Sequence, residues 1–315
     1  MATYRIEPDE STLHGYFSCE LAPVLTIDPG DTVIYRTLDA GWGLIDQPHS
    51  FKTPQKRKRP SPARDRGHAL CGPIAIRGAK PGMTLRVTIK KILPGKWGWS
   101  SGGGFSSPLN LRLALADGPE YVLRWVLDTD HMLARSQFGH TIRMHPFMGV
   151  MGMPPNELGV HSTFPPRFCG GNLDCKELVA GSQLYLPIPV EGGLFSIGDG
   201  HAAQGDGEVA GPALECPMEH VEVELQLQDA MQVAMPRART PSAWVAFGLH
   251  ADLDEAFALA LEGMIELMQQ LYGFARKEAL VMASLAVDFR VTQVVNGTKG
   301  IHAVLQDGRF NVGAT

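Results

Sequence analysis

The sequence lacks a pattern of paired cysteines. Its five cysteines are an odd number at irregular spacing and include no CxxC pair: Cys19, Cys71, Cys169, Cys175 and Cys216. This pattern supports neither a disulfide framework nor a zinc site built from thiolates. Free cysteines are typical of a reducing compartment, so we expect the protein to be cytoplasmic.

The chain also lacks the signals of a membrane or nucleic-acid partner. No apolar run is long enough to cross a bilayer, and the first residues are polar, without an apolar signal region. The net charge of −5 offers no global attraction to nucleic acid or to an anionic membrane surface. Five basic residues gather among prolines at 52–60, where we expect a solvated surface loop.

Glycine and proline, by contrast, are abundant, at 35 and 23 of the 315 residues. Between them, residues 31–40, 72–95 and 220–229 alternate apolar and polar side chains with the period of two that half-buried strands show. Many short strands joined by tight turns are typical of a sandwich or a barrel. The sequence therefore predicts a mainly β fold with sandwich-like or barrel-like strands.

The C-terminal region follows a different pattern. Residues 252–274 begin with acidic side chains and continue with apolar residues at helical spacing, and a second helical pattern follows before an alternating strand. We therefore expect an α+β C-terminal part with a helical segment near 252–286. The chain is expected to form one unit over 1–315, with a β-rich part (1–230) and a smaller α+β part (231–315) if it divides.

Metal-ligating and proton-transferring side chains crowd one glycine-rich segment, LFSIGDGHAAQGDGEVAG at 194–211. It holds Asp199, His201, Asp206 and Glu208 within ten positions. We expect these groups to lie on a loop between two strands, where a rigid scaffold can aim them. Zinc accepts imidazole together with carboxylate, whereas calcium takes oxygen ligands. The pattern predicts a metal site, with an array of turns capped by Asp side chains as the alternative.

A second polar group lies upstream, in GGNLD at 170–174. Its two glycines allow close backbone approach, and Asn172 and Asp174 follow them directly. Asp174 is a candidate metal ligand, with a role in an Asx turn as the alternative. Cys169, which precedes the glycines, is a candidate nucleophile because neighbouring backbone amides can lower a thiol pKa.

Two histidines elsewhere also have a context that suggests a role. His68 directly precedes a predicted strand, and His145 lies in an apolar loop broken by glycine and proline that could wall a pocket. A structural role remains the alternative for each, because neither histidine stands in a ligand spacing of its own. Trp97, Trp99 and Phe147 are further candidates for apolar walls.

Several of these segments together resemble one known family. The run from GGNLD through GSQLYLP and GGLFSIGDGHAAQGDGEV to GPALE is closely similar to the signature of the acetamidase/formamidase family. The segments HALCGPIAIRGAKPGMTLRVTI and SLAVDFRVTQVVNG also resemble that family, so that the likeness covers nearly the whole chain and is weakest over 95–140. The resemblance implies a β-dominated fold and hydrolysis of short amides, such as formamide or acetamide, to ammonia and a carboxylate.

The resemblance also implies the composition of the site. By position, it puts the following residues there: Asn172, Asp174, Asp199, His201, Gln204, Asp206 and Glu208, with His68 at a matching histidine. We expect a divalent cation, zinc before calcium, with four candidate ligands: Asp174, Asp199, His201 and His68. Glu208 or Asp206 would be the general base, and Asn172 is expected among the catalytic residues. Backbone amides of Gly170 and Gly171 would stabilise the oxyanion.

The chain departs from the family pattern at two positions. Cys169 stands where family members commonly have a histidine, and Met83 stands where they often have an acidic residue. A metal-binding histidine would thus be replaced by a thiolate or be missing. Two alternatives to metal-assisted amide hydrolysis stay open, namely acyl transfer through Cys169 and a β-rich binding protein with a structural metal. The apolar stripe of the C-terminal helix and the strand edges favour a homo-oligomer.

Overall fold

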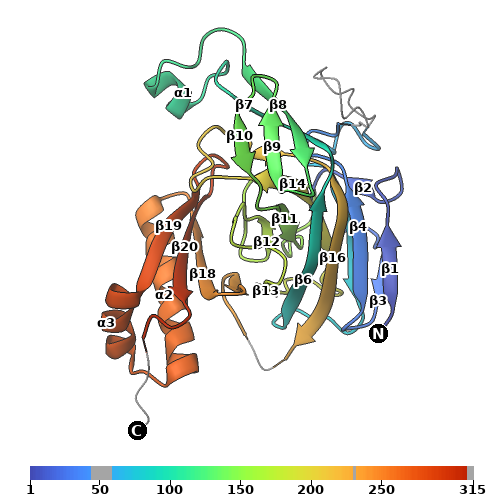
Figure 1. Cartoon of the computed structure of the whole chain (residues 1–315). Helices are drawn as coiled ribbons and strands as arrows, with labels where there is room; N and C mark the ends of the chain where they lie inside the picture. Colours follow the sequence, from blue (N-terminus) through green and yellow to red (C-terminus); the bar gives the residue numbers. More distant parts are fainter. Residues whose placement is uncertain (44–58, 230–231, 311–315) are drawn as a thin grey trace.

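A computed structural model describes residues 1–43, 59–229 and 232–310, so the basic segment expected at 52–60 lies almost entirely outside the described residues. The described chain forms two large β-sheets, with two helices packed beside the C-terminal strands (Figure 1). This architecture confirms the predicted mainly β class with an α+β C-terminal part.

The first sheet has nine strands and runs from the N-terminal strand to the C-terminal hairpin. In spatial order its strands are β1 (Thr3–Ile6), β4 (Thr32–Thr37), β16 (Met218–Gln228), β6 (Thr84–Pro94), β13 (Gln183–Pro187), β17 (Arg237–Arg239), β18 (Ala243–His250), β20 (Lys299–Gln306) and β19 (Val287–Gln293). All neighbours are antiparallel except the pair β1 and β4. The C-terminal strands therefore continue the same sheet that the N-terminal region begins.

The second sheet has eleven strands, with β14 near its centre. Its main path is β10 (Thr141–Arg143), β9 (Leu133–Ser136), β8 (Tyr121–Asp128), β7 (Trp97–Gly102), β15 (Leu214–Glu215), β14 (Phe195–Ala203), β11 (Phe147–Gly152) and β12 (Gly170–Asn172). Off this path, β2 (Leu13–His14) and β3 (Leu25–Ile27) pair with β5 (Leu70–Ile76), which in turn pairs with β14. Strand β14 thus has β5, β11 and β15 as partners.

One continuous hydrophobic core joins the two sheets. It includes Val87 of β6 and Val223 of β16 from the first sheet, and Ile74 of β5 and Ile197 of β14 from the second, all completely buried. Strands β6 and β16 expose alternate side chains, as their sequences predict. Burial of these apolar faces is the main driving force for packing the sheets together.

The helical segment predicted near 252–286 is confirmed as α2 (Leu253–Tyr272) and α3 (Arg276–Ala286). The Asp252 side chain accepts hydrogen bonds from the amides of the first turn of α2, and Gly273 ends the helix with a left-handed φ of 71°. Helix α2 packs against β18 and β20, and α3 packs against α2 and β19, in a second core cluster that includes Met264 and Met268. A third, short helix, α1 (Pro108–Arg112), lies at the top of the view in Figure 1, away from α2 and α3.

Two segments that were expected to be loops are strands. The strand expected over 193–197 continues through the GDGH motif as the fully buried β14, so that residues 198–203 are strand instead of loop, and residues 147–152 form the fully buried β11. Their glycines allow close packing instead of turns: a Cβ on Gly198 would lie 2.3 Å from the carbonyl oxygen of Ala69, and one on Gly200 would lie 2.7 Å from the Met218 side chain. Only the part of the motif after Ala203 is a loop.

Candidate active site

The candidate site is centred on β14, where Asp199 and His201 lie two residues apart. Both side chains are buried, and His201 pairs in register with Phe147 of β11. Asp199 has a φ of 59°, in the left-handed region that a non-glycine residue adopts at a cost of about 1–3 kcal/mol. Such an outlier in the middle of a sheet is typical of a functional position.

Three further carboxylates come from other segments and meet His201. Asp174 follows β12, Glu208 lies in the loop after β14, and Glu215 ends the short strand β15. Ligand atoms of Asp174, Asp199 and His201 lie within 4.8 Å of one another, and so do those of His201, Glu208 and Glu215. We call these five side chains the acidic cluster. Asp174 and Glu208 also have positive φ angles, of 49° and 45°.

A glycine makes room for the acidic cluster. Gly149 lies in β11 directly beside it, and an ideal Cβ there would lie 2.5 Å from Asp199 Oδ2 and 2.8 Å from Asp174 Oδ1. The same Cβ would lie 2.9 Å from His201 Cε1. Real Cβ contacts essentially never fall below 3.0 Å, so any other residue at this position would displace the cluster.

Gln204 sets the orientation of the imidazole. The Nδ1–H of His201 donates to Gln204 Oε1 at 3.0 Å, and Gln204 Nε2 donates to the backbone oxygen of Asp174 at 2.7 Å. His201 Nε2 therefore points to the carboxylates, 3.4 Å from Asp199 Oδ1 and 3.2 Å from Glu215 Oε1. A second hydrogen bond that fixes the ring in this way is typical of metal-ligating histidines.

Several buried carboxylate oxygens of the acidic cluster have no hydrogen-bond partner among the described residues, namely Asp174 Oδ1, Glu208 Oε2 and Glu215 Oε2. His201 Nε2 lies close to two carboxylate oxygens but makes no well-directed hydrogen bond to either. No backbone amide of the described chain donates to the side chain of Asp174, Asp199 or Glu208. The turn-array alternative is therefore wrong, because capped turns require such bonds. Unsatisfied buried acceptors that converge in this way fit a cation.

The acidic cluster has strongly perturbed protonation. Burial raises the pKa of Glu208 to about 11 with help from Asp174, and burial with the Asp199 charge raises the pKa of Asp174 to about 8. Burial also raises the pKa of Glu215, to about 7, against the effect of His201. For His201, burial opposes the charged form, but Glu215 and Asp199 outweigh it and raise its pKa well above the ordinary value. Perturbations of this size favour a functional site.

His68 and Asn172 lie near the acidic cluster but outside the two ligand groups. The His68 charge is close enough to lower the pKa of Asp199 against the effect of burial, while His68 Nδ1 is 2.9 Å from Thr163 Oγ1. Asn172 is buried in β12, and its side-chain amide donates to the Phe164 carbonyl at 3.0 Å. Its Oδ1 has no partner in the described chain.

The two glycines predicted to stabilise an oxyanion lie in β12, opposite β11. Both have a φ of 90°. The Gly170 N–H donates to the Arg167 carbonyl oxygen at 2.9 Å, so this amide is already engaged. Gly171 pairs in register with Met151.

Asp206 and Cys169 lie apart from the acidic cluster. Asp206 is exposed and pairs with Lys176, whose Nζ is 2.9 Å from its Oδ2. This position leaves Glu208 as the candidate base. Cys169 is completely buried, donates its Sγ hydrogen to the Met153 carbonyl oxygen at 3.2 Å, and has a pKa raised to about 12 by burial. A buried neutral thiol of this kind is a poor nucleophile and a poor ligand.

Three contributors to the acidic cluster were not anticipated from the sequence. Glu215 stands within the run GPALE, Gly149 lies in an apolar strand, and Asn296 donates its side-chain amide to Asp174 Oδ2 at 2.7 Å. A single acidic residue between the apolar Leu214 and Cys216 is the signal that could have identified Glu215. No local signal marks Gly149 or Asn296.

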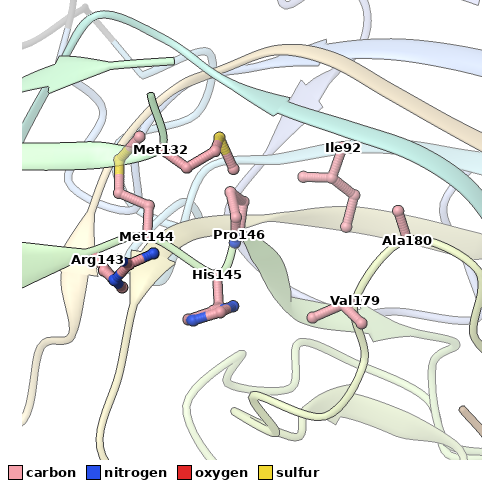
Figure 2. A pocket seen from close by; sticks show the side chains of 8 residues that line it. All are labelled: Ile92, Met132, Arg143, Met144, His145, Pro146, Val179 and Ala180. Carbon is pink, nitrogen blue, oxygen red and sulfur yellow. The ribbon is translucent and has the colours of Figure 1, made fainter. Parts of the chain in front are cut away.

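A pocket of about 370 Å³ lies among the described residues, lined in part by the segment that directly precedes β11 (Figure 2). Figure 2 shows Arg143 and His145 close together on one side, with Val179 and Ala180 across from them. The complete lining is Ile92, Met132, Arg143, Met144, His145, Pro146, Val179 and Ala180. The expectation that His145 walls a pocket is thus confirmed, although no residue of the acidic cluster lines it.

A two-sheet β fold with four buried carboxylates around one imidazole is typical of sites for acid–base or metal-dependent chemistry. Residues 2–161 and 158–305 match the model of the Acetamidase/Formamidase family, so the chain belongs to this family. The resemblance noted in the sequence is thereby confirmed.

Two individual relatives match this chain at moderate identity or over part of its length. The chain is 25% identical over 264 residues to a formamidase of Methylophilus methylotrophus, a match that covers 64% of this chain and 60% of that protein. A 47-residue stretch is 51% identical to an acetamidase of Mycolicibacterium smegmatis, covering 15% of this chain and 12% of that one. The chain thus spans about 60% of the length of the formamidase that it matches.

Solved structures share the fold over nearly the whole chain. An acetamidase of Yersinia enterocolitica has a TM-score of 0.82 at 28% identity, with 96% of this chain and 92% of that chain covered. A gamma lactamase of Delftia acidovorans has a TM-score of 0.63 at 18% identity, with 98% and 94% covered, and this likeness concerns the fold alone.

Proposed function

We propose that the protein hydrolyses a small linear amide to ammonia and a carboxylate with the help of a divalent cation. The single observation that carries this proposal is the acidic cluster, in which buried acceptor atoms without partners converge around His201. Family membership supports amide hydrolysis as the reaction, since the relatives are a formamidase and an acetamidase by name.

The donor set favours zinc over calcium. Zinc is held by imidazole nitrogen together with carboxylate oxygens, whereas calcium takes six to eight oxygen ligands. Asp174, Asp199 and His201 supply one imidazole and two carboxylates within 4.8 Å. The proton that Glu215 and Asp199 draw to His201 stands where a cation would be held, so cation binding would release it.

The residues of the chain would divide the work as follows. A bound divalent cation would polarise the amide carbonyl and lower the pKa of a water molecule. Glu208, the most exposed of the cluster's carboxylates at 7%, has a raised pKa that the charge of the bound cation would lower. It would then accept the proton of the attacking water and pass it to the departing nitrogen. Gln204 would hold His201 and the Asp174 backbone in place, and the free Oδ1 of Asn172 would accept a hydrogen bond from the amide nitrogen.

We further propose that the amide approaches from the side of the pocket in Figure 2. One wall, which includes His145 and Pro146, continues into Phe147, whose ring stands edge-on to His201 with centroids 5.0 Å apart. The other wall, Val179 and Ala180, belongs to the connection between β12 and β13, which also contains Asp174. If this is the route, Ala180→Trp should lower kcat/KM and leave the metal content unchanged. Equal kcat/KM in this variant would exclude the route.

The decisive experiment measures ammonia release from formamide, acetamide and propionamide, before and after chelation, with metal content determined on the same sample. Activity that chelation abolishes and zinc restores supports the proposal. Undiminished activity in metal-free protein would remove the cation from the mechanism. Bound metal without hydrolysis of any amide would leave the second candidate, a binding protein with a structural metal, which the buried position of the acidic cluster permits.

We also propose that the protein is a homo-oligomer. Apolar side chains are exposed around α1 and the neighbouring strands β8 and β10, namely Phe105, Leu111, Leu113, Tyr121, Phe138 and Ile142. A group of exposed apolar side chains of this size is typical of an interaction surface. Light scattering coupled to size-exclusion chromatography tests this proposal, and a monomer at micromolar concentration would contradict it.

A further inference from the structure

The turn between β19 and β20 reaches from the C-terminal part of the chain to the acidic cluster. Asn296 lies in this turn, 122 residues after Asp174 in sequence, and its side-chain amide donates to Asp174 Oδ2 at 2.7 Å. The other oxygen of Asp174, Oδ1, is buried without a partner and lies next to Gly149 and the Asp199 carboxylate. The two oxygens of this carboxylate thus have different surroundings.

The position of Asn296 is itself fixed by hydrogen bonds within the turn. The Oε1 of Gln293 accepts from the backbone amides of Val295 and Asn296 at 3.0 and 3.2 Å, and its Nε2 donates to the Thr298 carbonyl at 2.6 Å. Gln293 is completely buried. The turn therefore presents the Asn296 amide to Asp174 in one orientation.

The same hairpin also holds the loop that carries Glu208. The Gly207 N–H donates to the Thr292 carbonyl oxygen at 3.1 Å, and the Val294 N–H donates to the Gly207 carbonyl oxygen at 3.2 Å. One hairpin of the first sheet thus supports two carboxylates of the acidic cluster, which otherwise lies in the second sheet. Support from a rigid neighbouring element is what a precise polar site requires.

From these contacts we infer that Asn296 is a positioning residue for the metal site. By holding Oδ2, it leaves Oδ1 of Asp174 as the one oxygen turned to Asp199 and His201, and it keeps that oxygen at a fixed distance from them. Outer partners of this kind contribute about 10–100-fold to metal affinity or activity. This inference rests on the proposed function only through its requirement for a cation at the acidic cluster.

The test is a double-mutant cycle on the full-length protein, with Asn296→Ala, Asp174→Ala and the double variant. Zinc affinity is measured by competition of the metal-free protein with a chromogenic chelator, and kcat/KM is measured on the best amide. Asn156→Ala is the matched control, since Asn156 is exposed and has no hydrogen bond to the acidic cluster among the described residues. Asn296→Leu adds an uncharged side chain of similar size without the amide donor.

If Asn296 acts through Asp174, Asn296→Ala should lower zinc affinity about 10–100-fold in the wild-type background and less than about threefold in the Asp174→Ala background. Asn296→Leu should match Asn296→Ala, and the control should match wild type. A loss that persists in the Asp174→Ala background would show that Asn296 merely stabilises the turn, and this would overturn the inference. An unchanged zinc affinity in Asn296→Ala would overturn it as well.

The two proposals fail in different ways. Wild-type protein that binds zinc and shows the expected coupling, but hydrolyses no amide, would refute the proposed reaction and support the role of Asn296. Amide hydrolysis that depends on zinc, with additive effects of the two substitutions, would support the reaction and refute the role of Asn296. Wild-type protein without zinc binding and without hydrolysis would refute both.

Discussion

Gly149→Ala is the sharpest perturbation that the structure offers, because it adds one methyl group directly beside the acidic cluster. The new Cβ would lie 2.5 Å from Asp199 Oδ2 and 2.8 Å from Asp174 Oδ1, whereas ordinary contacts begin at 3.4 Å. The backbone of Gly149 is not in the left-handed region, so alanine itself is tolerated there. The carboxylates must therefore move, by ~1 Å, while the fold is kept.

The expected loss follows from the geometry that catalysis and metal binding require. Ligand distances in metal sites hold to within about 0.2 Å, and a misplacement of ~1 Å costs on the order of 10²-fold in rate. We expect kcat/KM to fall ~100-fold or more and zinc affinity to fall with it. Overpacking of a buried site costs about 1–3 kcal/mol in the free energy of unfolding, which chemical denaturation can measure.

Gly205→Ala is the matched control for this experiment. Gly205 lies in the loop between β14 and Glu208, its φ is also outside the left-handed region, and a Cβ there would meet no atom within 4 Å. It should leave activity and zinc affinity unchanged. A Gly149→Ala variant that is folded and has wild-type kcat/KM and zinc affinity would refute the assignment of the site to the acidic cluster.

Three further predictions concern other residues. Glu208→Gln should lower kcat on the best amide about 10²–10⁴-fold while zinc remains bound, and an unchanged kcat would remove Glu208 as the base. Cys169→Ala should retain activity, and iodoacetamide should not inactivate the folded wild type, because the thiol is buried and its pKa is raised to about 12. Inactivation by one equivalent of iodoacetamide would instead support acyl transfer through Cys169. Burial lowers the pKa of His14 to about 4 in the folded protein, whereas an unfolded histidine has a pKa near 6.5. The unfolded chain therefore binds this proton more readily, and the free energy of unfolding decreases as the pH falls below about 6.5. Denaturation in urea should show that wild type loses about 2 kcal/mol more between pH 7.5 and pH 5 than His14→Gln does, and equal losses would contradict the assignment.

The parts of the fold that were predicted from the sequence have one face on the core and one face in solvent. Strands β6 and β16 alternate for this reason, and α2 has an acidic cap at Asp252 and a glycine at its end. The second part of strand β14, residues 198–203, was missed because it is buried on both faces and shows no alternation. Its glycines also suggested turns. In the structure they are required instead because residues at β5 and β16 pack so closely against them that no Cβ would fit.

The site was predicted in part for a related reason. Asp199, His201 and Glu208 stand close together in sequence, and the family resemblance added Asp174. Gly149, Glu215 and Asn296 come from three distant segments, and their convergence depends on pairing in the two sheets, which a sequence pattern does not encode. Asp206 was included because it is near in sequence, but its side chain turns to Lys176 at the surface.

The energetics of the acidic cluster distinguish a site from a structural motif. Asp174, Asp199 and Glu208 all have left-handed φ angles, and each such residue costs about 1–3 kcal/mol. Buried carboxylate oxygens without partners add to this cost. A merely structural cluster would be more stable with these acids replaced by apolar residues, so its cost needs a compensating ligand. A cation bound to the folded state alone, at 100 times its Kd, stabilises it by about 2.7 kcal/mol, which is the order of one such strained residue.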